Sequence, residues 1–483
     1  MTTATGPTTT AVGVSVVCAG CGYHASPGEP FPIRCPRRIA GDDIDHVMTR
    51  VIDQTGVIFH PTGDPNPFVR FREMFRAYHV ARAAGWSDGR YVGLVRRLDD
   101  AVAAVDGRRF GVTPFERIGP LSDRLGFTGR GGIWVKDETG GVAGSHKARH
   151  LMGIILELLV EEETGRLADP TRPLAIASCG NAALAAATVA RAAGRRLLVF
   201  VPTTAEPGVL ARLGSLGAEV AVCLRRPGTT GDPTLERLEG AIVSGAVPFT
   251  CQGNENGLAI EGGATLGYEI AAELARTGRV LDRLVVQVGG GALASACIQG
   301  LREAADQGVG SLPRIDTVQT TGAWPLKRAH ERVVERLRAA GADVGPGIRV
   351  DLADPAVKTV FSEVARHRSG FMWPWETEPR SIAHGILDDE TYDWLAVVRG
   401  MVATGGTALV VDEATLAEAN DLARASTDLD ADHTATAGLA GFLALLRSGD
   451  VEPDEAVAIL LTGARRADQP SAPSHEQKER SRS

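Results

Sequence analysis

The stretch IWVKDETGGVAGSHKARHLMGIILELLV, residues 133–160, joins an apolar run, a glycine-rich turn and a second, longer apolar run. The first run is typical of a buried strand, and the second has the length of a helix. Lys147 then lies near the start of the helix, where the helix dipole disfavours its charge. A solvated lysine on a first helical turn is the simpler interpretation. The stretch predicts a strand, turn and helix unit of an α/β fold around an unusually placed lysine.

Strand-like and helix-like segments alternate along the rest of the chain. RRLLVFVP (195–202) follows an alanine-rich helical pattern, AEVAVC (218–223) follows a shorter one, and DRLVVQV (282–288) leads into a further helix. Near-continuous apolar strands between helices are typical of parallel sheets covered on both faces. We predict an α/β fold with two lobes of parallel-rich sheets flanked by helices, preceded by a short cysteine-containing N-terminal extension.

The amino-acid composition limits the kinds of molecule that we expect the protein to bind. The chain has 483 residues, with 44% hydrophobic and 23% charged residues and a net charge of -8. A surface that follows phosphates needs clustered positive charge, so we expect no nucleic-acid partner. No apolar run reaches the length of a membrane span, and the start lacks the pattern of a signal peptide. We therefore expect a cytoplasmic protein that acts on a small molecule and has no membrane partner.

The domain organisation follows from length and local composition. A chain of this length exceeds one ordinary core. We predict an N-terminal extension over 1–60, a large cofactor-binding domain from 61–150 and 251–465, and a small mobile domain over 151–250. The polar, proline-rich and serine-rich tail, 466–483, is expected to be disordered.

Seven cysteines are spread along the chain. Four lie in apolar surroundings and predict buried thiols rather than a disulfide framework. Cys18 and Cys21 have the spacing of one half of a zinc ribbon, but only Cys35 follows them, with His24 as a candidate fourth ligand. We expect a degenerate ribbon that holds no metal, and a zinc site on these cysteines is the alternative.

Two turns join a strand-like run to a helix-like run and carry candidate binding groups. Ser178, Cys179, Gly180 and Asn181 bring a hydroxyl, helix-start amides and a side-chain amide together, as carboxylate binding requires. Simple N-capping by Ser178 or Asn181 is the alternative. The second turn, Gly289, Gly290 and Gly291 before Ala292, has bare backbone amides that suit a phosphate.

The glycine turn also satisfies the dinucleotide pattern G-x-G-x-x-A, which is weak on its own. A nicotinamide cofactor requires an acidic residue at the end of the next strand, but that strand ends in Thr320 and Thr321. A nicotinamide-linked oxidoreductase is therefore disfavoured. Near the C-terminal end of the fold, Thr462 follows a buried strand, where it either bonds a heterocycle nitrogen or simply ends the strand.

Taken in order, the lysine segment, the Ser178 turn, the glycine turn and Thr462 resemble the fold-type II family of pyridoxal-phosphate-dependent enzymes. The resemblance runs from about Gly111 to Arg465 and includes IWVKDE, NGLAIEGGATLGYEI and EPRSIAHGI. VCAGCGYHASPGEPFPIRCP and NPFVRFREMF are most similar to the threonine synthase branch, and the chain as a whole resembles the branch of the threonine synthases and the serine and threonine dehydratases. The family implies pyridoxal 5′-phosphate as cofactor and a homodimer.

The resemblance also implies a role for each candidate residue. Lys147 corresponds to the lysine that forms the Schiff base, a role that needs a lysine able to lose its proton near neutral pH. The implied cofactor contacts are Gly289, Gly290, Gly291 and Ala292 to the phosphate, His146 to the phosphate or packed beneath it, Asn181 beside the ring hydroxyl, and Thr462 facing the pyridine nitrogen. Ser178, Cys179 and Gly180 complete the loop that receives the substrate carboxylate.

The lysine segment departs from the threonine synthase pattern. GVAGSHKARH replaces Asn-Pro-Thr-Gly-Ser-Phe-Lys-Asp-Arg, so His146 stands for an aromatic residue and Ala148 for an acid. We therefore expect a lyase or synthase that performs β-elimination or β-replacement on a small hydroxy or O-activated α-amino acid of the serine or threonine type. The alternatives are threonine-synthase-like γ-replacement on O-phosphohomoserine, a nicotinamide-linked oxidoreductase and a non-catalytic ligand sensor.

Overall fold

The computed structural model describes residues 13–53, 56–167, 169–225 and 232–466. The polar start, 1–12, and residues 467–483 of the predicted disordered tail lie outside the described residues. The α-helices of the described part are α1 Pro67–Arg70, α2 Arg76–Ala83, α3 Asp88–Asp106, α4 Gly119–Arg124, α5 Lys147–Glu163, α6 Asn181–Ala192, α7 Pro207–Ser215, α8 Pro233–Val243, α9 Ala259–Gly263, α10 Thr265–Thr277, α11 Ala292–Asp306, α12 Pro325–Ala339, α13 Pro355–Arg366, α14 Trp394–Thr404, α15 Glu413–Ser426 and α16 Ala437–Ser448.

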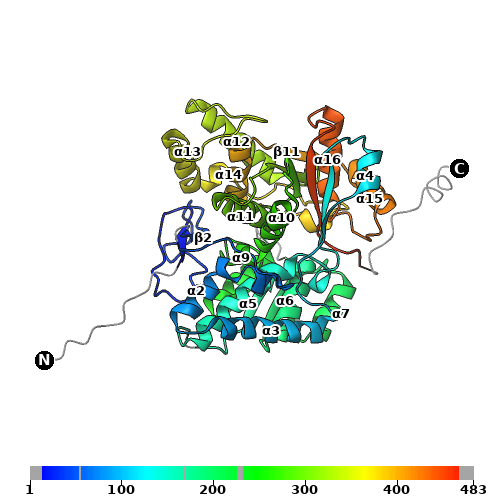
Figure 1. The fold of residues 1–483 in the computed structure, drawn as a ribbon. Helices are drawn as coiled ribbons and strands as arrows, with labels where there is room; N and C mark the ends of the chain where they lie inside the picture. The colour runs from blue at the N-terminus through cyan, green and yellow to red at the C-terminus, as the bar shows by residue number, and fades with distance from the viewer. Residues whose placement is uncertain (1–12, 54–55, 168, 226–231, 467–483) are drawn as a thin grey trace.

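The helices and sheets form two lobes. Figure 1 shows α2, α3, α5, α6 and α7 in one lobe and α12 to α16 in the other, with α9, α10 and α11 between them. Four short 3-10 turns connect longer elements, namely η1 Arg72–Met74, η2 Val142–Gly144, η3 Arg368–Gly370 and η4 His384–Ile386. Among the described residues, no helix is both long and apolar enough to cross a bilayer.

The first lobe contains a four-stranded, wholly parallel sheet. Its order is β7-β6-β5-β8, with β5 Leu174–Ala177, β6 Leu197–Pro202, β7 Glu219–Cys223 and β8 Val247–Pro248. The apolar runs predicted as strands at 195–202 and 218–223 form β6 and β7, so these two strand predictions are confirmed. The loop after β5 leads directly into α6.

The second lobe contains a six-stranded sheet. Its order is β11-β10-β9-β12-β4-β3, with β3 Phe115–Arg117, β4 Gly132–Asp137, β9 Arg283–Gln287, β10 Arg314–Thr320, β11 Ala408–Val411 and β12 Ala456–Leu461. Within this sheet only the edge strand β3 runs antiparallel, so the predicted parallel-rich architecture is confirmed. Because the carboxyl ends of parallel strands meet at one edge, the segments after β4, β9 and β12 lie near one another.

A third, two-stranded antiparallel sheet forms the N-terminal extension, with β1 Val14–Cys18 and β2 Met48–Ile52. The predicted division into a large domain, 61–150 with 251–465, and a small domain, 151–250, stays a prediction. The four-stranded sheet falls within 174–248, whereas α3, from the range assigned to the large domain, packs against α6 of the first lobe.

Helix α5 is buried within the first lobe. It begins at Lys147, as the sequence predicts, and nearly all of its residues from Ala148 to Val160 are buried. A helix that is buried on every side requires neighbours all round, and α5 packs against α2, α6 and α9. The contact with α9 is close enough that a Cβ added to Gly153 would lie 2.8 Å from Gly262 Cα. The start of α5 is therefore held firmly within the fold.

A buried ion network connects α5 to the six-stranded sheet. Lys136 on β4 pairs with Glu269 on α10, and Arg149 on α5 lies 2.5 Å from the same carboxylate and 2.8 Å from Glu138. Burial alone would raise the pKa of Glu269, but Arg149 and Lys136 outweigh this effect and the pKa lies below its usual range. Glu269 is therefore ionised and neutralises two buried cations, one of which lies on the same helix turn as Lys147.

Glu269→Ala should lower the free energy of unfolding by about 3–5 kcal/mol, because Lys136 and Arg149 would stay buried with one counter-charge fewer. Glu273→Ala, on the same helix, removes a pair with the exposed Arg276 and should cost less than about 1 kcal/mol. Urea unfolding followed by tryptophan fluorescence measures both changes. Equal losses for the two variants would contradict the central role of Glu269.

Candidate active site

One cavity of about 540 Å³ lies between the two lobes at the carboxyl ends of β5, β9 and β12. All eleven residues that the sequence analysis proposed for cofactor and substrate binding line it: His146, Lys147, Ser178, Cys179, Gly180, Asn181, Gly289, Gly290, Gly291, Ala292 and Thr462. Its size is typical of a small-molecule site. The fold thus gathers four segments that lie far apart in the sequence.

Lys147 is positioned by backbone contacts between the segment before α5 and the segment after β12. Ser145 and Gly463 form an antiparallel bridge, and the His146 N–H donates to the Thr462 carbonyl at 3.2 Å. The turn before the helix includes Ala143 in the left-handed region, with φ of 55°. Lys147, the first residue of α5, is half-buried and lines the cavity. The position predicted from the sequence is therefore confirmed, whereas its chemical role stays a prediction.

The His146 imidazole is buried next to Lys147. Its Nδ1 lies 3.2 Å from the Thr462 carbonyl oxygen, which can only accept a hydrogen bond, so Nδ1 carries the proton. Burial, together with Lys147 and His150, holds the pKa of His146 well below its usual range. The neutral ring then presents Nε2 as an acceptor, and this atom has no hydrogen-bond partner within the described residues. Contact with a cofactor phosphate stays a prediction for His146.

The turn Gly289–Gly290–Gly291 exposes backbone amides at the start of α11, and we call it the glycine cradle. A Cβ at Gly290 would lie 2.8 Å from the Tyr392 ring, and Gly291 has φ of +95°, so side chains do not fit at these positions. The Asp388 carboxyl lies against this turn, because a Cβ built at Gly289 would be 2.5 Å from its Oδ2. Amides at the N-terminus of a 15-residue helix suit a phosphate group.

The loop from Ser178 to Gly180 connects β5 to α6, as predicted. Asn181 begins α6, and its Oδ1 accepts a hydrogen bond from Arg466 Nη1 at 2.9 Å. With Oδ1 held by Arg466, the amide points its Nδ2 toward Gly463. A Cβ built at Gly463 would lie 3.2 Å from this nitrogen. Arg466 also pairs with Glu206 at 3.3 Å. The loop therefore presents helix-start amides and a fixed asparagine to the cavity.

Thr462 is held by a glutamine that the sequence analysis did not select. Gln287 Nε2 lies 2.8 Å from Thr462 Oγ1 and 3.1 Å from each of the carbonyl oxygens of Ala435 and Leu460. The two carbonyls determine which end of the amide is the donor. Thr462 Oγ1 thus accepts from Gln287 and retains its own O–H as a donor. A threonine fixed in this way suits a ligand atom that accepts a hydrogen bond.

Four acidic side chains also line the cavity: Glu206, Asp232, Asp388 and Asp432. Burial raises the pKa of Asp388 to about 6, although Lys147 and the Gly290 N–H act in the opposite direction. Sequence reasoning missed these acids and Arg466, because they come from loops without a binding motif. The segment that ends in Asp388 contains IAHGI, whose resemblance to the family is the only signal that pointed to it.

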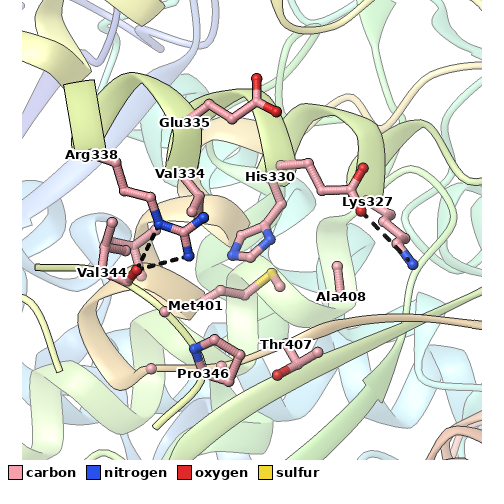
Figure 2. A pocket seen from close by; sticks show the side chains of 15 residues that line it. Lys327, His330, Val334, Glu335, Arg338, Val344, Pro346, Met401, Thr407 and Ala408 are labelled. Carbon is pink, nitrogen blue, oxygen red and sulfur yellow. Dashed lines mark hydrogen bonds and ion pairs between the residues drawn. The ribbon is translucent and has the colours of Figure 1, made fainter. Parts of the chain in front are cut away.

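A second cavity, of about 340 Å³, lies between α12, α14 and β11 (Figure 2). Burial, together with the charges of Arg338 and Lys327, lowers the pKa of His330 there to about 4. Within the described residues, this cavity shares no lining residue with the cavity around Lys147. It is therefore separate from the candidate active site.

Comparison with known proteins identifies the family. Residues 108–463 match the family described as "Pyridoxal-phosphate dependent enzyme". The chain therefore belongs to the pyridoxal-phosphate-dependent enzyme family, as its sequence pattern suggested, and the cofactor of that family is pyridoxal phosphate. Family membership favours this cofactor over the nicotinamide alternative.

Curated relatives are synthases and dehydratases. The chain is 26% identical over 354 residues to a threonine synthase of Halalkalibacterium halodurans, covering 73% of this chain and 82% of the relative. It is 23% identical to a threonine synthase of Methanocaldococcus jannaschii over 73% of this chain and 74% of the relative. An L-serine dehydratase of Saccharomyces cerevisiae is 31% identical over 39% of this chain and 57% of the relative.

Solved structures share the fold. A threonine deaminase aligns over 78% of this chain and 99% of its own chain, with a TM-score of 0.54 and 23% identity. A fungal L-serine ammonia-lyase from Rhizomucor miehei aligns over 73% of this chain and 94% of its own, with a TM-score of 0.52 and 18% identity. The two-lobed α/β architecture is thus that of the fold-type II pyridoxal-phosphate enzymes.

The residues of the cavity fit this cofactor. Lys147 supplies a primary amine, the glycine cradle has backbone amides with no room for side chains, and Thr462 retains a free O–H donor. These three features lie in one cavity and match the aldehyde, the phosphate and the pyridine nitrogen of the group in chemical type.

Asp388→Asn should increase the affinity for pyridoxal 5′-phosphate, and the gain should grow with pH. The pKa of Asp388 is about 6, so its carboxyl is neutral below that pH and places a negative charge beside the glycine cradle above it. The expected gain at pH 8 is on the order of tenfold. Absorbance titration of cofactor-free protein at several pH values measures it.

Asp389→Asn is the matched control, because Asp389 is the next residue, is exposed and does not line the cavity. Its affinity ratio to the unmodified protein should not vary with pH. An Asp388→Asn gain that is the same at pH 5 and pH 8 would show that the charge of Asp388 does not act on the cradle.

Proposed function

We propose that the protein is a lyase or synthase that performs β-elimination or β-replacement on a small hydroxy or O-activated α-amino acid of the serine or threonine type. The observation that carries the proposal is the single cavity in which Lys147, the glycine cradle, the Ser178 loop and the Thr462 hydroxyl meet. Relatives named threonine synthase and L-serine dehydratase support an amino-acid substrate of this size.

Lys147 carries the cofactor and moves the substrate α-proton. When bound at Lys147, pyridoxal phosphate supplies an electron sink that stabilises negative charge at the substrate α-carbon. The Lys147 amine would serve as the general base that takes this proton. The bridge between Ser145 and Gly463 holds the backbone next to Lys147 in place, so the amine stays in the cavity.

The loop from Ser178 to Asn181 orients the substrate. Helix-start amides and the Ser178 hydroxyl bind the substrate carboxylate, because the N-terminus of α6 carries partial positive charge. Arg466 fixes Asn181 through its Oδ1, so that Nδ2 is available as a donor. An amino acid held by its carboxylate presents its α-carbon to Lys147 in a constant orientation.

The Thr462 hydroxyl would face the pyridine nitrogen of the bound cofactor. Because its oxygen accepts from Gln287, its O–H is free to donate and would leave that nitrogen without a proton. A neutral ring nitrogen is a weaker electron sink than one protonated by a carboxylate. This arrangement favours elimination or replacement at the β-carbon over transamination.

A second candidate function is γ-replacement on O-phosphohomoserine, which the two threonine synthase relatives favour. That substrate brings a phosphate in addition to its carboxylate. The described cavity lining has Lys147 and Arg466 as its lysine and arginine side chains against four acids, and Arg466 is already paired with Glu206. Like-charge repulsion therefore favours a substrate with one anionic group.

Reduction with borohydride should attach the cofactor covalently to Lys147. Intact-mass measurement should find one pyridoxyl phosphate group per chain in the unmodified protein and none in Lys147→Ala, because only an imine at this amine is trapped. Lys327→Ala, in the separate second cavity, should retain the group. Retention of the adduct by Lys147→Ala would exclude Lys147 as the attachment site.

A substrate panel distinguishes the candidate reactions. Serine, threonine, O-acetylserine, O-phosphoserine and O-phosphohomoserine are each added to cofactor-loaded protein, and absorbance changes and oxo-acid or amino-acid products are measured. We expect turnover of serine-type or threonine-type substrates. Product from O-phosphohomoserine alone would overturn β-chemistry, and spectral shifts without any product would indicate a ligand sensor.

A further inference from the structure

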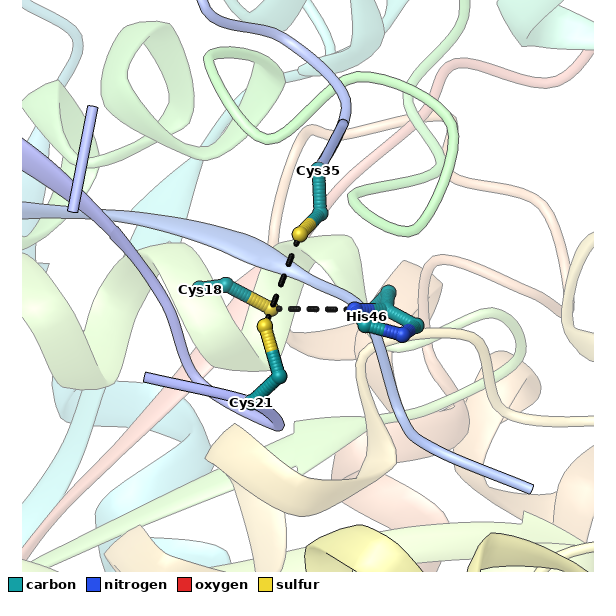
Figure 3. A group of neighbouring side chains, drawn as sticks. All are labelled: Cys18, Cys21, Cys35 and His46. Atoms are coloured by element: carbon teal, nitrogen blue, oxygen red, sulfur yellow. Dashed lines mark hydrogen bonds between the residues drawn. The ribbon is translucent and has the colours of Figure 1, made fainter. Parts of the chain in front are cut away.

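Three cysteines and a histidine of the N-terminal extension meet in one cluster (Figure 3). Each residue of the group Cys18, Cys21, Cys35 and His46 offers one ligand atom, and these atoms all lie within 4.8 Å of one another. Cys18 ends β1, whereas His46 lies two residues before β2. Cys18, Cys35 and His46 are buried. Side chains separated by up to 28 positions thus point their donor atoms at a common centre.

The spacing of these atoms fits a tetrahedral metal ion. With zinc–sulfur bonds of about 2.3 Å and zinc–nitrogen bonds of about 2.0 Å, tetrahedral ligands lie about 3.8 Å apart for two sulfurs and about 3.5 Å for sulfur and nitrogen. Cys21 Sγ lies 3.6 Å from Cys35 Sγ, and Cys18 Sγ lies 3.4 Å from His46 Nδ1. The sulfur separation is far longer than a disulfide bond, and all seven cysteines are free thiols.

The histidine is prepared for metal binding by a carboxylate. His46 Nε2 lies 3.0 Å from Asp42 Oδ2, so Nε2–H donates and Nδ1 presents its lone pair to the three sulfurs. Metal-binding histidines typically donate their other ring N–H to a carboxylate or carbonyl in this way. The His46 side chain is 2% exposed, so the pair with Asp42 is sheltered from water.

The local sequence brings the ligands together. Within the turn CAGC, the Cys18 N–H donates to the Tyr23 carbonyl at 2.7 Å and the Ala19 N–H to the Val47 carbonyl at 2.8 Å. Gly20 packs so closely on the Asp45 backbone that a side chain there would overlap it. These contacts place the cysteine turn directly against the segment that carries His46.

We propose that Cys18, Cys21, Cys35 and His46 bind one structural zinc ion. Three thiolates and an imidazole complete a closed four-coordinate site, which is the pattern of structural rather than catalytic zinc. From the sequence we expected a degenerate ribbon without metal, because one close cysteine pair with incomplete downstream spacing is weak evidence, and His24 was a candidate fourth ligand. His24 is exposed and does not belong to the cluster, whereas His46 supplies the fourth donor atom.

The segment around the zinc ligand Cys35 contacts residues 254–257, which belong to a loop that forms one wall of the active-site cavity. The Gly257 N–H donates to the Ile33 carbonyl at 3.0 Å, and Arg38 Nη1 lies 3.3 Å from the Asn254 carbonyl and 3.1 Å from Glu255. Ile33 and Arg38 flank the ligand Cys35. The loop they hold begins with Thr250, Cys251 and Gln252, which line the cavity. Loss of the metal therefore loosens this wall without removing a cavity residue.

Metal analysis of the full-length protein tests the proposal. Protein purified under reducing conditions without chelator should contain about one zinc per chain, and cobalt(II) added to metal-stripped protein should give the visible absorption of a tetrahedral thiolate site. Cys21→Ser and His46→Ala should reduce bound zinc at least about tenfold, and Asp42→Asn should weaken binding on the order of tenfold.

His24→Ala is the matched control for His46→Ala, and Cys223→Ser, at a thiol in the four-stranded sheet, is the control for Cys21→Ser. Both should retain full zinc. Hydrogen exchange of residues 250–257 should become faster after metal removal, which reports on the wall whether or not the protein turns over a substrate. The proposal is overturned if unmodified protein takes up neither zinc nor cobalt, if Cys21 and Cys35 are joined as a disulfide, or if His24→Ala loses zinc as His46→Ala does.

Discussion

The arrangement of the active site depends on the backbone pairing between the segment before α5 and the segment after β12. Ser145 bridges Gly463, and the His146 N–H bonds to the Thr462 carbonyl. This pairing fixes the start of α5, and hence Lys147, against the strand end that carries the threonine hydroxyl. Buried pairs between an arginine of α5 and two glutamates hold the same helix from its other side. Backbone hydrogen bonds, rather than side-chain contacts, therefore fix the position of Lys147 relative to Thr462.

The cavity around Lys147 combines two electrostatic features. Helix N-termini at Asn181 and Ala292 provide partial positive charge for a carboxylate and a phosphate, whereas four acids also line the cavity. The two features lie side by side at Asp388, whose carboxyl packs against the glycine turn before Ala292. This distribution supports the proposed substrate, an amino acid with a single anionic group.

Much of the fold could be predicted from the sequence, because its apolar runs and helical patterns alternate clearly. The apolar runs that became β6, β7, β9 and β12 lack polar interruptions over most of their length, and glycines mark the turns before α6 and α11. The acids of the cavity, Arg466 and Gln287 were not accessible, because nothing local distinguishes them from surface or core residues. His46 was missed for the same reason, because it follows Cys35 at a distance outside the short spacing of a ribbon motif.

The sequence by itself determined the family, the α/β architecture and the position of Lys147, because these depend on local order: a strand, a glycine turn and a helix start repeated along the chain. Only the tertiary structure decided which residues share a site. Parallel strands bring their carboxyl ends to one edge regardless of the length of the intervening chain, so the lysine segment meets Thr462 although 316 positions separate His146 from that threonine. In the same way, pairing of β1 with β2 carries His46 to the cysteines. Contacts between residues so far apart in the chain have no fixed sequence spacing, so the sequence alone does not predict them.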